Sequence, residues 1–435
     1  MTLTVIIAVV TVALMITTVL IKPYVTVGRF KIGLYWVVCL VGAVAMLVTN
    51  CISLEKVFNG ITADSSVNPI KILTLFLSMT LISVYLGDAG FFDYVANRIF
   101  LNNKSGQIKL FLILYLVISV LTVFTSNDVI ILTFTPPICL FCKKAKISPL
   151  PYLIGEFVAA NTWSMTLIVG NPTNVYLAGA SGIGFAEYLS VMWLPAIVGG
   201  IVGLMVILIL FHNQLKVPVQ KSPELVAPEK IKIDKVPMLA AIFHLVLCIM
   251  LLALSDFIGL EMWIICLVLA LSLTIFDLVY DVAKKHTARP VWRSVKKEPY
   301  ELIPFVLSMF VIVLALNESG ATKVLSDLLI TGERSDGMKI GVLSALSANL
   351  LNNIPMSVFF ESVINGQSRS ALFGAIIGSN VGAFITPIGA LAGIMWSKIL
   401  SEYHVKLPFV KFIAYGTAVA VPTLLASCGT LLLML

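Results

Sequence analysis

The chain of 435 residues is 59% hydrophobic and only 12% charged, and its formal net charge is +7. A soluble protein usually has about a quarter charged residues, so this chain lacks the side chains that a water-exposed surface of normal polarity needs. The composition therefore excludes a cytosolic enzyme, a nucleic-acid-binding protein and a disordered protein, and it indicates a polytopic membrane protein. The 7 cysteines lie mostly within apolar runs, which is typical of packing residues rather than of a disulfide framework.

Ten apolar runs are long enough to be membrane-spanning helices, because about 20 helical residues cross a bilayer core. The first run, residues 3–21, has Lys22 after it and no basic residue before it, which is the reverse of the charge order of a signal peptide. The other runs cover roughly residues 32–49, 70–87, 152–177, 189–211, 236–255, 260–279, 301–317, 370–400 and 408–434. The sequence thus predicts an all-α polytopic membrane protein.

Two further apolar stretches, 108–142 and 338–364, have polar centres at Thr125–Asp128 and Asn352–Asn353. Each is too polar in the middle for a plain span, so we expect re-entrant helical hairpins that enter and leave on one side. With the N-terminus outside, this topology places all but six of the 29 Lys and Arg in cytoplasmic loops, as membrane proteins prefer. If the hairpins crossed the membrane, the basic residues between 216 and 297 would face outside. We therefore predict a plasma membrane protein with both termini outside.

The two halves of the chain repeat the same order of features. The matched positions are Gly90 and Gly320, Asn127 and Asn352, Asn161 and Asn380, and Pro172 and Pro387. Each half has five spans and one hairpin, and because five is odd, the second half must be inverted relative to the first. The predicted units are a first repeat at 1–211 (hairpin 108–142, broken helix 152–187), a cytoplasmic linker at 212–237, and a second repeat at 238–435 (hairpin 338–364, broken helix 370–400). Inverted repeats of this kind are typical of transporters, with the binding site near the bilayer midplane.

Non-helical backbone is expected at four places, the two hairpin tips and the breaks at Pro172 and Pro387, where proline lacks an N–H. Such backbone is tolerated at membrane depth only inside protein or along a water-filled cavity. Helix N-termini at these places suit anions, and exposed carbonyl groups suit a cation or a proton carrier. Any single Asn there could equally form a helix–helix hydrogen bond. The recurrence at matched repeat positions favours a binding site.

Asp128 at the first tip is the residue that most strongly suggests ion coupling, because an acid within the membrane is costly and usually functional. It would carry a coupling proton or help to bind a coupling cation, and the alternative is an N-cap on the second arm of its hairpin. Glu156 is expected to pair at the interface with the basic loop at Lys143–Lys146. Gly378 and Gly382 suit close helix packing as well as ligand contact.

Four motifs carry a resemblance to a known superfamily. They are Ser-Asn-Asp-Val-Ile-Ile-Leu-Thr-Phe-Thr-Pro at 126–136, Gly-Asn-Pro-Thr-Asn at 170–174, Asn-Asn-Ile-Pro at 352–355, and Gly-Ser-Asn-Val-Gly followed by Ile-Thr-Pro-Ile-Gly-Ala-Leu-Ala within 378–392. In this order they resemble the arsenite permease and citrate-transporter-like members of the ion transporter superfamily. The resemblance implies secondary active transport by an elevator-like motion, and a homodimer as in relatives with dicarboxylate substrates.

The resulting hypothesis is a secondary active transporter that moves a small anion, an arsenite-like oxyanion or a carboxylate or inorganic anion, coupled to a proton or sodium gradient. The residues expected to line the substrate site are Asn127, Asn171, Thr173, Asn174, Asn352, Asn353, Thr386 and Gly389. Those expected to hold the coupling ion or proton are Ser126, Asp128, Gly170 and Asn380, with a Na⁺ position near Ser126, Asn127 and Gly170.

Three other functions stay open at this stage. A sodium/proton antiporter without an anion substrate would use the same polar tips, and a passive channel would line its pore with them. A membrane-embedded enzyme would need a nucleophile–base pair or a metal cluster, whereas the 4 His are scattered and form no HExxH motif. No nucleotide motif, cofactor or structural metal is expected beyond a coupling Na⁺ or proton. The expected partners are the small anion, the lipid bilayer and a second copy of the chain, and no nucleic acid.

Overall fold

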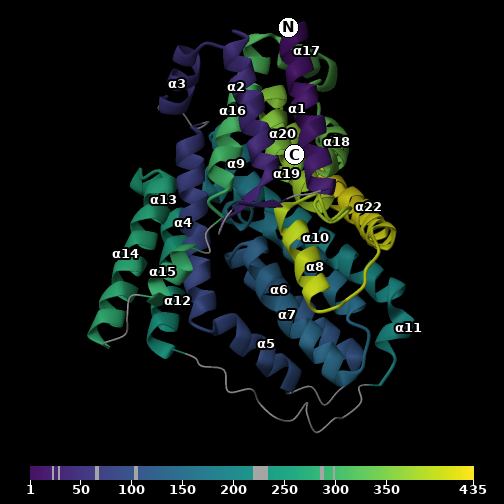
Figure 1. Cartoon of the computed structure of the whole chain (residues 1–435). Coiled ribbons are helices and arrows are strands. Elements are labelled where there is room, and N and C mark those ends of the chain that lie inside the picture. Colours follow the sequence, from purple (N-terminus) through teal and green to yellow (C-terminus); the bar gives the residue numbers. More distant parts are fainter. Residues whose placement is uncertain are drawn as a thin grey trace.

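The computed structural model describes residues 1–21, 24–27, 30–63, 68–101, 106–218, 234–284, 289–296 and 299–435. Almost all of them are helical (Figure 1). The first half contains α1(Thr2–Ile21), β1(Tyr24–Val27), β2(Phe30–Gly33), α2(Leu34–Val48), α3(Leu54–Thr62), α4(Pro69–Asp88), α5(Phe91–Leu101), α6(Gln107–Phe124), α7(Asn127–Ala145), α8(Leu150–Trp163), the 3-10 turns η1(Ser164–Thr166) and η2(Ile168–Gly170), α9(Pro172–Ala180), α10(Phe185–Leu210) and α11(His212–Leu215). The second half contains α12(Lys235–Ala253), α13(Ser255–Ile258), α14(Met262–Ala283), α15(Arg289–Lys296), α16(Leu302–Glu318), α17(Ala321–Leu329), α18(Asp336–Leu351), α19(Asn353–Ile364), α20(Arg369–Gly382), α21(Leu391–Glu402) and α22(Phe409–Met434).

The described residues include seven single helices that are long and apolar enough to cross a membrane, namely α1, α4, α6, α10, α12, α14 and α22. A further candidate is the pair α16 and α17, which bends by 79° at a short break. The prediction of an all-α polytopic membrane protein is therefore confirmed. The central linker predicted at 212–237 lies outside the described residues between 219 and 233.

One expected span begins differently from the prediction. The run at 32–49 starts as strand β2, which pairs antiparallel with β1, and becomes helical only at Leu34. Glu301, just before α16, fixes this junction: its carboxylate accepts hydrogen bonds from the Gly33 N–H at 3.1 Å and the Tyr35 hydroxyl at 2.7 Å. A partner more than 260 residues away in the chain thus sets where α2 starts, and hydropathy alone does not contain that information.

The two halves follow the same order of elements. A long helix ends at a glycine with a positive φ, 87° at Gly90 after α4 and 78° at Gly320 after α16, and a short helix follows each. A two-helix hairpin, an interrupted helix and a long helix then complete both halves. Figure 1 shows α5, α6 and α7 towards the lower end of the molecule, whereas α17 and α18 lie towards the upper end. An inverted repeat requires such an arrangement.

One arm of the second hairpin, α18, packs unusually close to α20. A Cβ added to Gly374 would lie 2.1 Å from the carbonyl oxygen of Gly337, and one added to Gly378 would lie 2.3 Å from that of Gly341. The backbones of α18 and α20 therefore touch, which is the way small residues let membrane helices associate. Of the two roles considered for Gly378, the structure shows close helix packing. This contact holds the second hairpin against the helix that carries Asn380.

Candidate substrate and ion site

The first hairpin tip separates α6 from α7 with two extended residues, Thr125 and Ser126. Asn127, the first residue of α7, is buried and donates from Nδ2 to Asn161 Oδ1 of α8 at 3.1 Å. Asn161 in turn donates from Nδ2 to the Phe157 carbonyl oxygen one turn earlier at 2.8 Å. The tip is therefore fastened to the interrupted helix of its own half.

Several oxygens at this tip have no hydrogen-bond partner among the described residues. The buried Ser126 Oγ and Asn127 Oδ1 are both unpaired. Asp128 is half-buried in the first turn of α7, where a negative charge interacts favourably with the helix dipole. The N-cap position belongs to Ser126, so Asp128 is not the N-cap that was considered as its alternative role. The tip thus presents neutral oxygens next to a carboxylate.

The first break runs from Ser164 to Asn171 and has a defined shape. Gly170 is required there, because a Cβ at this position would lie 2.3 Å from the Ser164 carbonyl oxygen. Asn171 is the N-cap of α9 and accepts the Thr173 N–H at 3.2 Å. Pro172 occupies the first position of α9, where its missing N–H costs no hydrogen bond. The proline therefore starts the second helix rather than kinking the first.

Asn380, in α20, connects this break to the second half of the chain. Its Oδ1 accepts from Asn171 Nδ2 and from Ser164 Oγ, each at 2.9 Å. Its Nδ2 donates to Asn174 Oδ1 at 2.7 Å. Beside it, the hydroxyl groups of Thr173 and Ser379 lie 2.9 Å apart. We call these six residues the Asn380 cluster: Ser164, Asn171, Thr173, Asn174, Ser379 and Asn380, all fully buried.

The second tip and the second break are joined in a similar way. Asn352, between α18 and α19, donates from Nδ2 to the Ile388 carbonyl oxygen at 3.2 Å, and the Asn353 N–H donates to the Gly389 carbonyl oxygen at 3.0 Å. The backbone of Asn352 has φ 72° and ψ 154°, a region that costs on the order of 1–3 kcal/mol for a residue other than glycine. Such strain persists only where surrounding contacts hold it, and it is common at functional sites.

Asn349 fastens the second break to the hairpin arm. Its Oδ1 accepts the N–H and the hydroxyl of Thr386 at 2.9 and 2.7 Å, and its Nδ2 donates to the Gly382 carbonyl oxygen at 2.9 Å. Pro387 lies within this break, between the end of α20 and the start of α21. Asn349 thus links the second break to α20 at Gly382, two residues after Asn380.

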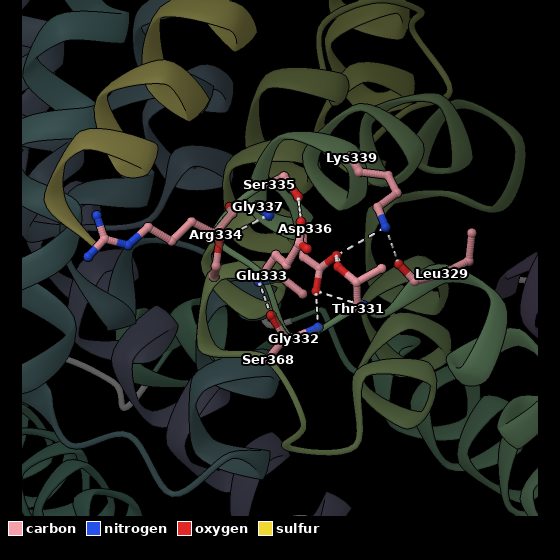
Figure 2. A network of polar contacts seen from close by, with 12 residues as sticks. Leu329, Thr331, Gly332, Glu333, Arg334, Ser335, Asp336, Gly337, Lys339 and Ser368 are labelled. Atoms are coloured by element: carbon pink, nitrogen blue, oxygen red, sulfur yellow. Dashed lines mark hydrogen bonds and ion pairs between the residues drawn. The ribbon is translucent and has the colours of Figure 1, made fainter.

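The end of the second hairpin away from its tip is held by Asp336, the first residue of α18 (Figure 2). Its buried carboxylate accepts from the Thr331 hydroxyl at 2.8 Å and from the Gly332 N–H at 2.9 Å, and it pairs with Lys339 Nζ at 3.0 Å. Burial alone would raise the pKa of Asp336, but the Lys339 ammonium and the hydroxyl and N–H donors outweigh this effect and lower the pKa. This network fixes the start of α18, at the opposite end of the helix from the tip at Asn352.

A cavity opens on the side of the second tip that faces α1. Asn352 and Ile388 line one wall of it, and apolar side chains of α1, α2 and α16 line the other. The cavity does not reach the Asn380 cluster, whose members do not appear in its lining. The polar tip is therefore adjacent to an apolar surface formed by helices outside the hairpins.

The structure brings most of the expected residues together in two linked groups, one around Asn380 and one at the second tip. It adds three residues that the sequence analysis did not select: Ser164, Ser379 and Asn349. Their signal in the sequence is weak, because isolated Ser and Asn residues in apolar runs are common. Glu156 differs from the expectation of interfacial pairing, since it is only 1% exposed and its hydrogen-bond partner is Thr135 rather than a lysine.

Comparisons with known proteins identify the family of this chain. The family model for citrate transporters matches residues 30–368. The chain belongs to the citrate transporter family. The computed structure is similar to the crystal structure of the Alcanivorax borkumensis YdaH transporter, with a TM-score of 0.56 over 99% of this chain and 97% of that one, at 14% sequence identity. This likeness supports the helical transporter fold and carries no statement on substrate.

Two relatives in sequence are arsenical pump membrane proteins. One from Escherichia coli is 28% identical over 376 residues, which is 83% of this chain and 85% of the relative. A putative one from Bacillus subtilis (strain 168) is 23% identical over 367 residues, covering 78% and 81% of the two chains. Together with the family, these relatives identify a multi-pass membrane protein of the anion-transporter type.

Proposed function

We propose that the protein is a secondary active transporter that moves a small anion, an arsenite-like oxyanion or a carboxylate or inorganic anion, coupled to a proton or sodium gradient. The observation that carries the proposal is the fully buried Asn380 cluster, in which an unwound segment of one half contacts a helix of the other. Unwound backbone surrounded by amides is tolerated at membrane depth where solutes are bound and moved. The names of the relatives, arsenical pump membrane proteins, favour an oxyanion.

Helix N-termini would attract the anion. α7, α9 and α19 begin at Asn127, Pro172 and Asn353, which lie at the first tip, the first break and the second tip. The first N–H groups of a helix have no intrahelical partner and carry partial positive charge, which suits an anion. In α9 and α19 the anion would replace the present acceptors of the Thr173 and Asn353 N–H groups, Asn171 Oδ1 and the Gly389 carbonyl oxygen. The cluster itself contains only amide and hydroxyl side chains. Partial charges hold an anion less tightly than a lysine or arginine would, which suits a site that must also release it.

The first tip would hold the coupling ion. Ser126 Oγ and Asn127 Oδ1 are buried acceptors without a partner, and Asp128 adds a carboxylate one residue further along α7. Oxygen atoms of this kind are the ligands that hard cations prefer, so the set fits Na⁺. The carboxyl group of Asp128 would alternatively carry a proton. Gly170 lets the backbone of the first break pass within reach of its neighbours.

An elevator-like motion is proposed from the division of the apolar core. One cluster of buried side chains comes mainly from α1, α2 and α16, with two residues of α4 and Ile354 of α19. A larger cluster contains most of the hairpin arms and broken helices, together with α12, α14 and the rest of α4. We propose that the first group is the scaffold and that the hairpins move with the broken helices that they grip. The repeats at 1–211 and 238–435 complete the proposal, with a cytoplasmic linker and outside termini that the distribution of basic residues along the chain supports. The homodimer is proposed from the family resemblance alone.

The test uses purified protein in detergent and in proteoliposomes. A thermal-shift screen against arsenite, phosphate, sulfate, citrate and C4 dicarboxylates, each with sodium or at several pH values, identifies the ligand class. A ligand at 100 times its Kd stabilises the folded state by about 2.7 kcal/mol. Uptake or efflux of that anion is then measured with and without a pH or sodium gradient.

The variant Asp128→Asn is compared with the native protein in the transport assay. Loss of gradient-driven transport with retained anion binding supports the role of Asp128 in coupling, whereas unchanged transport would refute that role. A proton signal produced by sodium alone, with no anion present, would instead indicate the sodium/proton antiporter. Transport that ignores both gradients would indicate a channel.

A further inference from the structure

Glu156 is a second buried acid that the proposed coupling site does not use. It lies in the middle of α8, where every residue from Pro151 to Thr162 is buried. Its Oε1 is 2.9 Å from the hydroxyl oxygen of Thr135 in α7, and its Oε2 has no hydrogen-bond partner among the described residues. An ionised carboxylate is rarely buried in this way, because its desolvation costs several kcal/mol unless a cation compensates.

The number of hydrogens available around Thr135 bears on the protonation state of Glu156. The Thr135 hydroxyl oxygen is 2.5 Å from the Ile131 carbonyl oxygen and 2.9 Å from Glu156 Oε1. A hydroxyl group has a single hydrogen, and a carbonyl oxygen has none to give. The close approach of Thr135 to Ile131 needs that hydrogen between the two oxygens. The contact with Glu156 is then favourable only if the acid itself supplies a hydrogen.

Among the described residues, no cation lies next to Glu156 to stabilise its charged form. Around Glu156 lie Thr135 and the thiol of Cys139 on α7 and the indole of Trp396 on α21. None of the described Lys, Arg or His side chains pairs with it. Lys143 follows Thr135 by more than two turns of α7, about 12 Å along a helix, and it is exposed.

The remaining helices packed against α8 are α6, α10, α20 and α22, and none of their described titratable groups pairs with Glu156. Tyr115 of α6 donates to the Gly200 carbonyl oxygen at 2.8 Å, and Tyr188 of α10 donates to that of Met165 at 2.9 Å. Arg369 of α20 pairs with Glu187, and Lys411 of α22 is exposed. On α8 itself, the Tyr152 hydroxyl lies 3.1 Å from Gln107 Oε1.

We propose that Glu156 is a proton-binding site in which the neutral acid donates its hydrogen to Thr135, while Thr135 donates to the Ile131 carbonyl oxygen. The position joins parts that the transport cycle would move, since α7 is an arm of the first hairpin and α21 follows the second break. In the proposed elevator-like motion these helices move together, and exposure of the group to water on one side of the membrane would ionise Glu156 and release its proton. The inference rests on the proposed function, because it assigns to Glu156 a share in proton coupling.

Infrared spectroscopy tests the proton independently of transport. In the Asp128→Asn background, the native Glu156 should show the carbonyl stretch of a protonated carboxylic acid at neutral pH. The additional change Glu156→Gln should remove that band, because glutamine has no carboxylic acid group. Glutamine keeps the shape of the side chain and a donor towards Thr135, so the site itself should stay intact. An identical spectrum with and without Glu156→Gln would overturn the proposal. If net transport proves independent of protons while the band is present, proton coupling in the proposed function fails and the protonated site stands.

The transport test separates coupling from binding. Glu156→Gln should retain anion binding and exchange of labelled for unlabelled anion. Its rate of transport driven by a pH gradient should fall at least tenfold. Glu402→Gln makes the same chemical change at an exposed residue that pairs only with Lys398 among the described residues, and it should transport normally. Full proton-driven transport by Glu156→Gln would refute the coupling role. Thr135→Val, which removes the acceptor of the Glu156 hydrogen, should shift the pH profile of transport without abolishing exchange.

Discussion

Replacing Asn380 with alanine probes the contact on which the proposed function depends. The substitution deletes an amide that pairs with Asn171 Nδ2 at 2.9 Å and with Asn174 Oδ1 at 2.7 Å, and all three residues are fully buried. Ser164 is less affected, because its hydroxyl also reaches the Asn161 carbonyl oxygen at 2.7 Å. Two buried polar groups are therefore left without a partner.

The expected cost follows from these two groups. A buried polar group that loses its partner destabilises the folded state by about 1–3 kcal/mol, so the total is about 2–6 kcal/mol. A water molecule that enters the vacated volume would recover part of this cost, so the measured value should lie towards the lower end of this range. With an unfolding entropy of about 2.1 cal/mol/K per residue, a chain of this length should lose about 2–7 °C in melting temperature.

The assay is thermal unfolding in detergent, followed by the transport measurement. Thr122→Val is the matched control, because Thr122 is also fully buried but its hydroxyl has no hydrogen-bond partner among the described residues. That change should leave the melting temperature unaltered or raise it slightly. If Asn380→Ala shifts the melting temperature no more than Thr122→Val does, the contact between the two halves is not the stabilising network that the distances indicate. Asn380→Ala should also lose transport, since α20 no longer positions the first break.

Two further substitutions test the first break and the base of the second hairpin. Gly170→Ala should abolish transport at normal expression. The added Cβ would lie 2.3 Å from the Ser164 backbone oxygen, so the first break must change shape. Normal transport by this variant would contradict the close approach of Gly170 to Ser164. Asp336→Asn should lower the melting temperature at neutral pH by weakening the contacts to Lys339 and Thr331. Because the pKa of Asp336 is lowered in the folded state, its contribution is complete above the ordinary aspartate pKa of about 3.9 and is lost as the pH falls below it. The difference between the variant and the native protein should therefore be constant from about pH 8 to pH 5 and should shrink towards pH 3, and a difference that grows on acidification would refute this assignment.

Local structure was largely predictable from the chain itself. The long apolar runs became helices within a few residues of the expected bounds, and the polar centres near Asn127 and Asn352 became the turns of two-helix hairpins. The broken helix expected at 152–187 ends earlier, since α9 stops at Ala180 and α10 begins at Phe185. The short helices α3, α5, α15 and α17 were not expected. Each has fewer apolar residues than a span, so a search for spans does not find it.

Hydropathy and the positions of proline, glycine and asparagine by themselves determined the class of protein, the hairpins and the interruptions, because each of these depends on residues close together in the chain. The partners across the molecule were decided only by the tertiary structure. Asn380 contacts Asn171 more than 200 residues away, and Glu156 contacts Thr135 instead of the lysines that follow it along α7. Such choices depend on how closely helices approach and which faces they present. A one-dimensional pattern shows that a polar residue must be satisfied, and packing selects the group that satisfies it.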